Sequence, residues 1–250
     1  MAFKQLKIVS VIILTSVLLG CSSAPKESEN EQHPNDPFEG VNRVMFDLNY
    51  DYIDPYLVRP VSIAYVETVP VPVRGGIGNF LANLDEPASI VNNLLMGKGE
   101  RAADHFNRFW INSTLGLLGF IDVASAAGIS KHDERQFGDM LGYHGVGHGP
   151  YFMVPGYGPI TARKTTSFID GKYVPLSLLN FWASAGKWAL EGMEKRYVLI
   201  PQEGTLEASP DPYALSREVY LQRRDYTAGL EVEIDEEEED YLDDYLDDGF

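Results

Sequence analysis

The residue with the clearest chemical role in the sequence is Cys21, the only cysteine of the chain. It directly follows Gly20 at the end of a short apolar segment, and Lys4 and Lys7 precede that segment. A basic start, an apolar stretch and a small residue at the cleavage site are typical of a secretory signal peptide, which is too short to cross a bilayer as a helix. A cysteine after the small residue completes a lipobox, in which the thiol is acylated. The pattern predicts a lipidated Cys21; an ordinary signal peptide with a chance cysteine is the alternative.

The residue after the lipobox indicates where the mature chain is delivered. Ser22 occupies a position at which bacterial lipoproteins retained at the inner membrane usually carry aspartate. We therefore expect a lipid-anchored protein on the periplasmic face of the outer membrane. Stable anchoring takes more than one acyl chain, and a triacylated cysteine provides it. Because lipid occupies the thiol of Cys21, no disulfide or thiol chemistry remains.

The other residue types that catalyse reactions do not form a recognisable site. His144 and His148 have the spacing of paired metal ligands on a helix, but the glycines between them disfavour a helix. The sequence contains neither a zinc-binding His-Glu-x-x-His motif nor the Gly-x-Ser-x-Gly motif of hydrolases. We therefore expect no enzymatic activity, no cofactor and no metal site.

Negative charge is concentrated at the end of the chain. The net charge is −17, and residues 231–250 contain 12 acidic and no basic residues. Such a block is typical of a solvated, disordered tail, which serves either solubility or the docking of a basic partner. Nucleic-acid binding is disfavoured, because no basic patch is present to neutralise phosphates.

These features divide the chain of 250 residues into four parts. Residues 1–20 form the predicted signal peptide, and residues 21–35 form a polar, flexible tether. Residues 36–228 are long enough for a single domain with a substantial core. Residues 229–250 form the acidic tail.

Apolar residues in the folded part recur mainly at helical spacing, with no alternating strand pattern and no internal repeat. The first predicted helix, 41–54, carries two apolar stripes and should end before Pro55. Pro60, Pro70 and Pro72 disfavour both helix and strand in the stretch that follows. The other predicted helices span 77–84, 87–96, 100–112, 176–197 and 211–226. The sequence therefore predicts a mainly α domain with irregular loops rich in glycine and proline.

Two apolar segments are not explained by amphipathic helices. The run 115–121 is far too short to cross a membrane and suits a buried or interfacial position. The segment 142–158 combines glycines and prolines, which prevent a long helix, with several aromatic side chains. A loop of this composition must be buried, cover another part of the protein or face lipid.

A series of motifs through the folded part resembles one family of bacterial lipoproteins. The motifs include Asp36-Pro37-Phe38-Glu39-Gly40, Asn42-Arg43, Arg59-Pro60-Val61, Glu86-Pro87, Asn112-Ser113-Thr114-Leu115-Gly116, Gly149-Pro150-Tyr151 and Asp211-Pro212-Tyr213. In this order and at this spacing, residues 36–225 are similar to the MlaA (VacJ) family of outer-membrane lipoproteins. Two features depart from the family: Lys164 stands where aspartate is usual, and the tail is more densely acidic.

The resemblance implies a ring-like helical domain that lies in the inner leaflet of the outer membrane. Proteins of this family are thought to take misplaced glycerophospholipids from the outer leaflet through an amphipathic channel. A soluble periplasmic lipid-carrier protein then receives the lipid, which preserves the asymmetry of the outer membrane. Members associate with trimeric porins, so the implied partners are phospholipid, a porin trimer and the carrier.

Together with the resemblance, the residue pattern suggests where a lipid path and its gate could lie. Polar residues between the apolar stripes of the first helix are candidates for the path: Asn42, Asp47, Asn49 and Asp51. Solvent exposure or capping of neighbouring turns is the alternative for them. Aromatic and apolar residues of the glycine-rich loop are candidates for a gate or a porin contact: Tyr143, Tyr151, Met153 and Tyr157. A buried segment that only fills the core is the alternative there.

Two other functions remain compatible with the sequence. A structural lipoprotein that bridges porins to other envelope proteins would share the lipobox and the helices but would need no lumen. A lipid hydrolase would need a nucleophile paired with a base, and the sequence offers no such pair.

Overall fold

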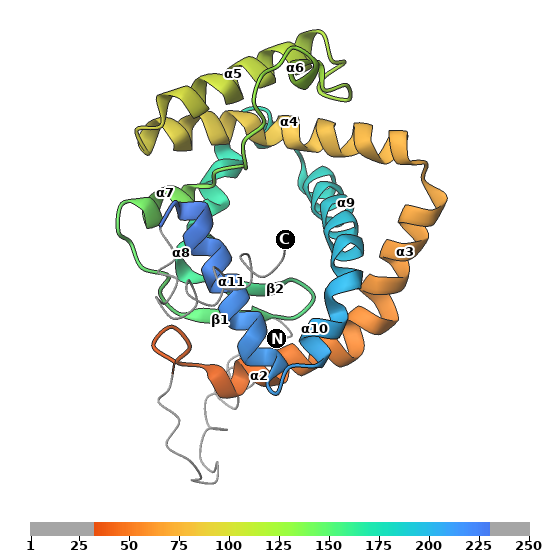
Figure 1. Cartoon of the computed structure of the whole chain (residues 1–250), viewed down its shortest axis with the longest axis vertical. Helices are drawn as coiled ribbons and strands as arrows, with labels where there is room; N and C mark the ends of the chain where they lie inside the picture. Colours follow the sequence, from red (N-terminus) through yellow and green to blue (C-terminus); the bar gives the residue numbers. More distant parts are fainter. Residues whose placement is uncertain (1–32, 231–250) are drawn as a thin grey trace, which may run out of the picture. The chain divides into compact units, whose positions relative to one another are not determined.

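The structure is a computed structural model that describes residues 33–230. The described chain is predominantly helical, and its strands form one two-stranded sheet (Figure 1). The mainly α class predicted from the sequence is confirmed. The signal peptide, Cys21 and the acidic segment from Glu231 lie outside the described residues. Within residues 33–230, no helix has both the length and the apolar character that crossing a bilayer requires.

The chain stays helical across the prolines that follow the first helix. Helix α2 (Glu39–Asp47) continues into a π-helical segment (Leu48–Val58) and then into α3 (Arg59–Thr68). The prediction that the first helix ends before Pro55 is therefore wrong. The wider π turn accommodates a residue without an N–H group, and Pro60 lies in the first turn of α3, where a free N–H is not needed.

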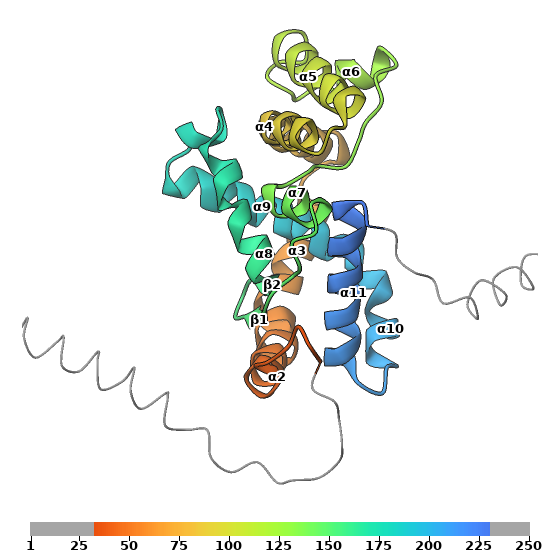
Figure 2. The ribbon, with the colours of Figure 1, turned by 90° about the vertical axis from the view of Figure 1, so that its left-hand side faces the viewer.

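The next two helices pack side by side, and their contact explains a second difference from the prediction. Helix α4 (Val71–Leu95) passes through Pro87 as one helix, where two pieces were expected. It lies along α5 (Gly99–Thr114), as Figure 2 shows. Asn83 of α4 donates a 2.8 Å hydrogen bond to the hydroxyl of Ser113 at the end of α5. Packing over this length outweighs the local cost of a proline.

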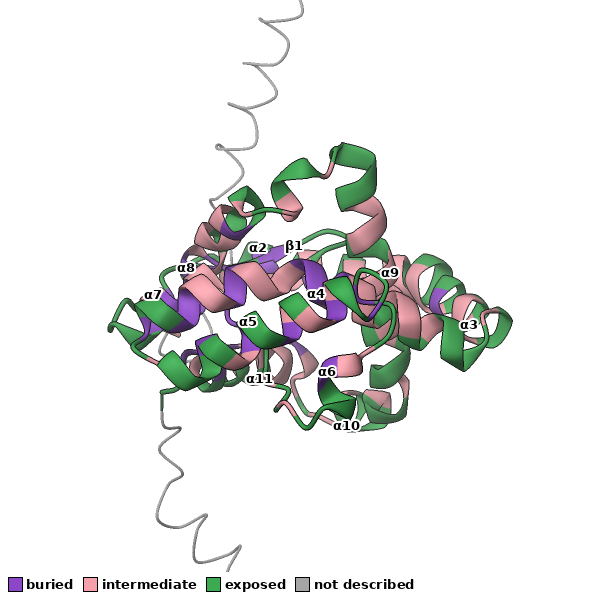
Figure 3. Ribbon diagram, turned by 90° about the horizontal axis from the view of Figure 1, so that it is seen from above, coloured by how far each residue is buried: buried purple, intermediate pink, exposed green. Residues whose placement is uncertain are grey.

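Helix α5 buries its polar face rather than its apolar one. Its buried residues are Ala102, His105, Arg108 and Asn112. Polar contacts hold this face: His105 lies 2.5 Å from the carboxylate of Glu86 in α4, and Arg108 forms an ion pair with Asp122 at 2.8 Å. On the outer face, Phe106 and Trp110 are 54% and 62% exposed. Figure 3 shows exposed residues of α5 beside the buried residues of α4.

The apolar surface continues past the end of α5. Leu115, Leu117 and Leu118 are each at least 65% exposed. Leu117 and Leu118 have positive φ angles, 53° and 61°, which are uncommon for leucine. The run 115–121 is thus an exposed apolar loop and not a buried segment, which leaves the interfacial position as a prediction. It leads into the short helix α6 (Val123–Ala126), whose first turn Asp122 caps.

The sequence analysis missed a β-hairpin. Strands β1 (Tyr151–Val154) and β2 (Gly158–Thr161) pair antiparallel, with Tyr151 opposite Thr161. Burial alternates along β1, but four residues are too few for alternation to stand out in a sequence. Gly156 and Gly158 adopt positive φ angles of 71° and 95° at the turn, which explains why glycine occurs there.

The hairpin contributes to the main hydrophobic core. Tyr151 and Met153 pack with Phe46 of α2 and with Tyr213 and Leu221 of the last helix. That helix, α11 (Pro212–Ala228), begins as predicted: Asp211 caps it and Pro212 occupies its first turn. Between the hairpin and α11 lie α8 (Ala162–Thr165), two 3-10 segments (Thr166–Lys172 and Leu176–Leu178), α9 (Phe181–Leu199), a short 3-10 turn (Ile200–Gln202) and α10 (Glu203–Glu207).

Two further contacts complete the arrangement of the helices. Helix α7 (Phe137–Tyr143) packs against α11, and α9 packs against α3. Arg196 of α9 makes two 2.6 Å hydrogen bonds to the carboxylate of Asp54 in the π-helical segment. Such bidentate pairs fix orientation as well as distance, so α9 is held in register beside the helices that precede α4.

Candidate functional site

A cavity of about 610 Å³ lies between α4, α9, the hairpin and the segments that join them. Helices α4 and α9 and strand β2, all labelled in Figure 1, contribute to its walls. The two 3-10 segments, residues 134–136, and Lys164 and Thr165 of α8 also line it. Sites for small molecules have this order of size and are concave.

One wall of the cavity is apolar. Tyr157 and Ile160 of the hairpin, Leu176 and Leu179 near the second 3-10 segment, and Trp188 of α9 line it. The rings of Tyr157 and Trp188 stack with centroids 6.2 Å apart and planes 4° from parallel. Because these residues come from three segments distant in sequence, the wall forms only in the folded domain.

Other residues of the lining are charged. Lys187 of α9 lies 2.7 Å from Asp85 of α4 and also contacts Glu191. Burial, and secondarily the nearby charge of Glu134, raises the pKa of Asp85 to about 7. Charged side chains face a partly apolar space here, which is the composition that an amphipathic ligand requires.

Four charged side chains on the lining have no ion-pair or hydrogen-bond partner among residues 33–230: Glu134, Arg135, Lys164 and Lys172. Burial lowers the pKa of Lys164 to about 8 and raises the pKa of Glu134. Asp170, the other acid nearby, is already occupied. It accepts 2.9 Å hydrogen bonds from the amide of Asn92 and from the backbone N–H of Phe137.

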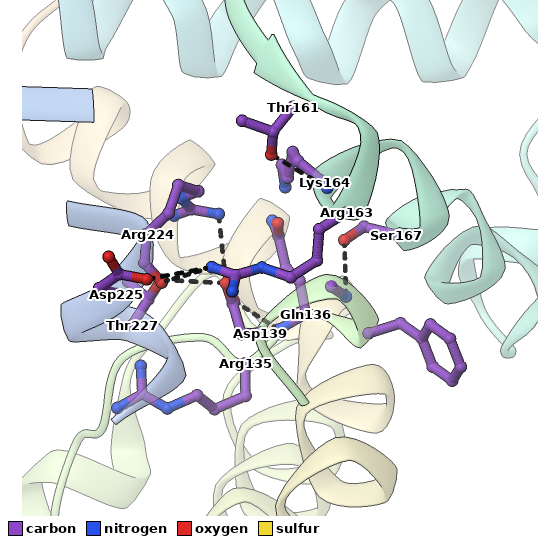
Figure 4. A network of polar contacts seen from close by, with 12 residues as sticks. Arg135, Gln136, Asp139, Thr161, Arg163, Lys164, Ser167, Arg224, Asp225 and Thr227 are labelled. Atoms are coloured by element: carbon purple, nitrogen blue, oxygen red, sulfur yellow. Dashed lines mark hydrogen bonds and ion pairs between the residues drawn. The ribbon is translucent and has the colours of Figure 1, made fainter. Parts of the chain in front are cut away.

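A polar network fixes the backbone that carries Lys164 (Figure 4). The hydroxyl of Thr161 caps α8 by accepting from the backbone N–H of Lys164 at 3.3 Å. The adjacent Arg163 is buried and donates a 3.0 Å hydrogen bond to the carbonyl of Val146. A Cβ atom at Gly138 would lie 2.8 Å from the carbonyl oxygen of Arg163, so glycine is needed for this close approach.

Asp139 of α7 ties the same network to α11. Its carboxylate accepts from the hydroxyl of Thr227 at 2.9 Å and lies 3.3 Å from Arg224. It also forms a capping box with Gln136 at the start of α7. The backbone that carries Lys164 is therefore held in place by contacts with two packed helices, α7 and α11.

A smaller cavity of about 200 Å³ lies between α3, α4 and α9. Glu134 and Glu191 line both cavities, so the charged lining of the larger one continues into the smaller one. Tyr65, Ile77 and Leu190 give the smaller cavity an apolar side.

None of the four polar residues predicted to line a lipid path lies on either cavity. Asn42 is buried; it donates to Asp36 and to the carbonyl of Tyr151, and it accepts from the N–H of Met153. Asn49 similarly contacts the turn of the hairpin: its amide donates to the carbonyl of Val154 and accepts from the N–H of Gly156. Asp47 and Asp51 are exposed. A transport role for these residues stays a prediction.

The predicted gate residues divide into two pairs. Tyr151 and Met153 are 0% and 6% exposed and belong to the core. Tyr143 and Tyr157 are exposed, and Tyr157 lines the larger cavity. Of the four, Tyr157 is therefore the one placed to affect access to the cavity. Gating itself stays a prediction.

The two loop histidines each have a protein partner. His144 lies 2.9 Å from the carbonyl of Leu95, and His148 lies 2.8 Å from the carboxylate of Asp225. Over residues 33–230, no three histidine, cysteine, aspartate or glutamate side chains are grouped as metal ligands would be.

Sequence reasoning did not identify the charged residues of the cavity. Asp85, Glu134, Lys187 and Glu191 belong to none of the motifs in the sequence, and a single sequence does not show that they converge. One signal was available: Lys187 and Glu191 are four residues apart, the spacing of an ion pair on one helix face. Lys164 was noted only as a departure from the family pattern.

A buried ionic cluster explains the Asp36-Pro37-Phe38 motif at the start of the domain. Asp36 is fully buried and lies 3.0 Å from Arg217 of α11. Its carboxylate also accepts from the hydroxyl of Tyr213 and, at 2.7 Å, from the amide of Asn42. The cluster joins the first and last segments of the described chain around the core.

Comparison with known proteins assigns the family. The model of the MlaA lipoprotein family matches residues 34–227. The intermembrane phospholipid transport system lipoprotein MlaA of Escherichia coli K12 is 43% identical over 227 residues, which is 90% of this chain and 89% of that protein. The lipoprotein of the same name from Haemophilus influenzae is 35% identical over 88% of this chain and 89% of its own length.

A solved structure has the same fold. It is described as the structural basis for maintenance of bacterial outer membrane lipid asymmetry. It aligns with a TM-score of 0.74 at 50% sequence identity and covers 77% of this chain and 98% of its own. The resemblance carried by the motifs between Asp36 and Tyr213 is thus confirmed: this chain belongs to the MlaA lipoprotein family.

Proposed function

We propose that this chain is an outer-membrane lipoprotein that removes misplaced glycerophospholipids from the outer leaflet and so maintains lipid asymmetry. The 610 Å³ cavity carries the proposal, because it combines an apolar wall with a charged one. Acyl chains would contact the wall of Tyr157, Leu176 and Trp188, and the head group would face the charged wall. The relatives named as phospholipid transport lipoproteins support the same function.

The exposed apolar surface supports a position in one leaflet. Trp110, Leu115, Leu117 and Leu118 are all exposed, at and beyond the end of α5. Each such side chain gains about 1.5–3 kcal/mol on full burial, so the folded domain adds membrane affinity to the lipid anchor. The domain would then lie as a ring of helices in the inner leaflet, held there without a spanning helix.

The proposed partners follow from this position. Lipid enters from the outer membrane, beside a porin trimer that contacts the exposed apolar faces. It leaves to a soluble periplasmic carrier protein. Passage of lipid requires binding and release but no bond cleavage, so the protein would act without catalysis.

A variant that fills the cavity tests the proposal. Ser184 of α9 is exposed and lines the cavity, so a Ser184→Trp side chain can enter the space without displacing core residues. Ala183→Trp is the control, because Ala183 is exposed and adjacent but does not line the cavity. In cells that depend on the lipidated protein, Ser184→Trp should leave phospholipid in the outer leaflet, while Ala183→Trp should restore asymmetry.

Normal asymmetry with a stable, correctly exported Ser184→Trp protein would contradict transport through this cavity. That outcome would favour a structural lipoprotein that bridges porins without a lipid path.

A further inference from the structure

Arg135 is a buried cation whose charge is not matched by a contact within the described chain. It is 7% exposed, and its Nε and Nη1 atoms are buried without a hydrogen-bond partner among residues 33–230. A buried charge is unfavourable unless it is paired and hydrogen-bonded. The guanidinium of Arg135 is therefore suited to bind an anion.

Two other basic residues lie near Arg135. Its side chain points away from Lys164, as Figure 4 shows. Burial, and then the charges of Arg101 and Arg135, lower the pKa of Lys98. Lys98 and Arg101 belong to the start of α5, which has no side-chain cap, so the helix N-terminus adds partial positive charge. Lys98, Arg101 and Arg135 together are called the basic cluster below.

Acidic residues nearby reduce the charge of the cluster but do not cancel it. The charges of Asp139 and Asp133 act on Arg135, yet within residues 33–230 neither carboxylate forms an ion pair with it. Asp139 is instead shared by Arg224 and Thr227. At Lys98 the charges that act are both positive. The cluster is thus left with positive charge that a further anion can neutralise.

The acidic end of the chain leaves the described domain beside this cluster. Gly229 follows α11 with a φ of 74°, and a Cβ atom built on it would lie 2.9 Å from the ammonium of Lys98. Residues 231–250 come directly after, with 12 acidic and no basic residues. An extended chain advances about 3.3–3.6 Å per residue, so carboxylates from Glu231 onwards are within reach of the cluster.

We propose that the acidic segment 231–250 folds back onto the basic cluster, where its carboxylates pair with Lys98, Arg101 and Arg135. The unpartnered Arg135, the complementary charges and the place where the segment begins carry the inference. It is independent of lipid transport, and it names the basic partner that the sequence left open for the tail. Because the segment belongs to the same chain, its carboxylates are present at the cluster at a local concentration on the order of millimolar.

Zero-length cross-linking of the purified protein, with its tail intact and in a non-ionic detergent, tests the contact. A water-soluble carbodiimide activates a carboxylate, which forms an amide bond with a lysine amine while the carbodiimide leaves as a urea. We expect mass spectrometry to find Lys98 joined to residues 231–250 in protein that stays monomeric. The yield should fall towards about 1 M salt, where the Debye length is about 3 Å.

Two substitutions separate charge pairing from the mere proximity of the segment. Arg135→Gln and Arg101→Gln keep Lys98 and the acidic residues but remove one charge of the cluster. At the salt concentration that halves the wild-type yield, each should lower the Lys98 cross-link about twofold or more. Arg223→Gln is the matched control, because it removes the same charge from an exposed position in α11 and should leave the yield unchanged. Arg101 is also exposed, so its substitution tests the inference even if Arg135→Gln does not fold.

Three results would overturn the inference. The first is the absence of a cross-link between Lys98 and residues 231–250 at low salt, and the second is a cross-link found only in dimers. The third is a yield that is the same in Arg101→Gln, Arg223→Gln and the wild type, which would show that proximity alone brings the segment to Lys98.

Discussion

Single buried residues in this protein hold distant segments together, and Asp36 is the clearest case. Its carboxylate is 0% exposed and is shared by Arg217, Tyr213 and Asn42. The sequence presented Asp36 as part of a motif but gave no reason for it. The reason lies 181 residues further along the chain, at Arg217, and pairing over such a separation cannot be deduced from one sequence.

Removing that carboxylate should be strongly destabilising. Asp36→Ala leaves the guanidinium of Arg217 buried without its main partner, a change that typically costs about 3–5 kcal/mol. Asp47→Ala, at an exposed position in α2, should change the free energy of unfolding by less than about 0.5 kcal/mol. Urea denaturation of the two purified variants measures the difference. Similar unfolding midpoints would refute the assigned role of Asp36.

Asp85 predicts a pH dependence of stability. Burial raises its pKa from 3.8 to about 7, so the folded state holds the proton more tightly than the unfolded state does. The contribution of Asp85 is thus most favourable at low pH and is lost as the pH rises from about 4 to about 7. Over that window the unfolding free energy of the wild type should fall relative to Asp85→Asn. Parallel pH profiles would show that Asp85 ionises as an exposed acid does.

At the scale of elements, local sequence patterns predicted most of the helices. They did not predict where some helices end or that others continue without a break. Helix α11 begins at Asp211-Pro212 as expected, because capping and proline placement are local effects. Helix α4 continues through Pro87 because α5 packs along it, which is a tertiary effect. The hairpin was not predicted because its strands, of four residues each, are too short to show an alternating pattern.

The hairpin and α9 are the elements best placed to control access to the cavity. Tyr157 stacks on Trp188, and the segment between the strands contains glycines that permit movement. We expect that a short thiol cross-linker between Tyr157→Cys and Trp188→Cys arrests lipid transfer by the purified protein. A cleavable linker should restore transfer after reduction, and each single-cysteine variant treated with the same reagent is the control. Unchanged transfer by the fully cross-linked protein would rule out a gate at this position.

At the scale of the whole molecule, the sequence was most informative about fold class and family and least informative about the cavity. The mainly α class followed from helical periodicity, whereas the cavity required α4, α9 and the hairpin to meet. Helix α5 also departs from the usual pattern of a surface helix: it exposes the apolar Phe106 and Trp110 and buries the charged Arg108. Exposed apolar surface of this kind marks a face that contacts a membrane or another protein.

Loss of the lipid anchor should separate the two contributions to membrane attachment. Cys21→Ala should prevent lipidation and either release the mature protein from the outer membrane or leave it uncleaved. The exposed apolar surface allows some residual affinity, which an added Leu117→Glu should reduce without loss of stability, because Leu117 is 67% exposed. Membrane fractionation measures both effects. Full outer-membrane retention of unmodified Cys21→Ala would contradict the lipoprotein assignment.

Photo-cross-linking from inside the cavity tests the lipid path most directly. A photoreactive residue at Leu176, on the apolar wall, should form a phospholipid adduct in cells, and Ser184→Trp in the same chain should abolish it. The same probe at Leu178, which is 75% exposed and lies off the cavity, is the control. The yield of its adducts should be the same with and without Ser184→Trp. Mass spectrometry of the purified adducts identifies the lipid. No adduct at Leu176, or one that persists at full yield when the cavity is filled, would contradict the claim that phospholipid passes through this cavity.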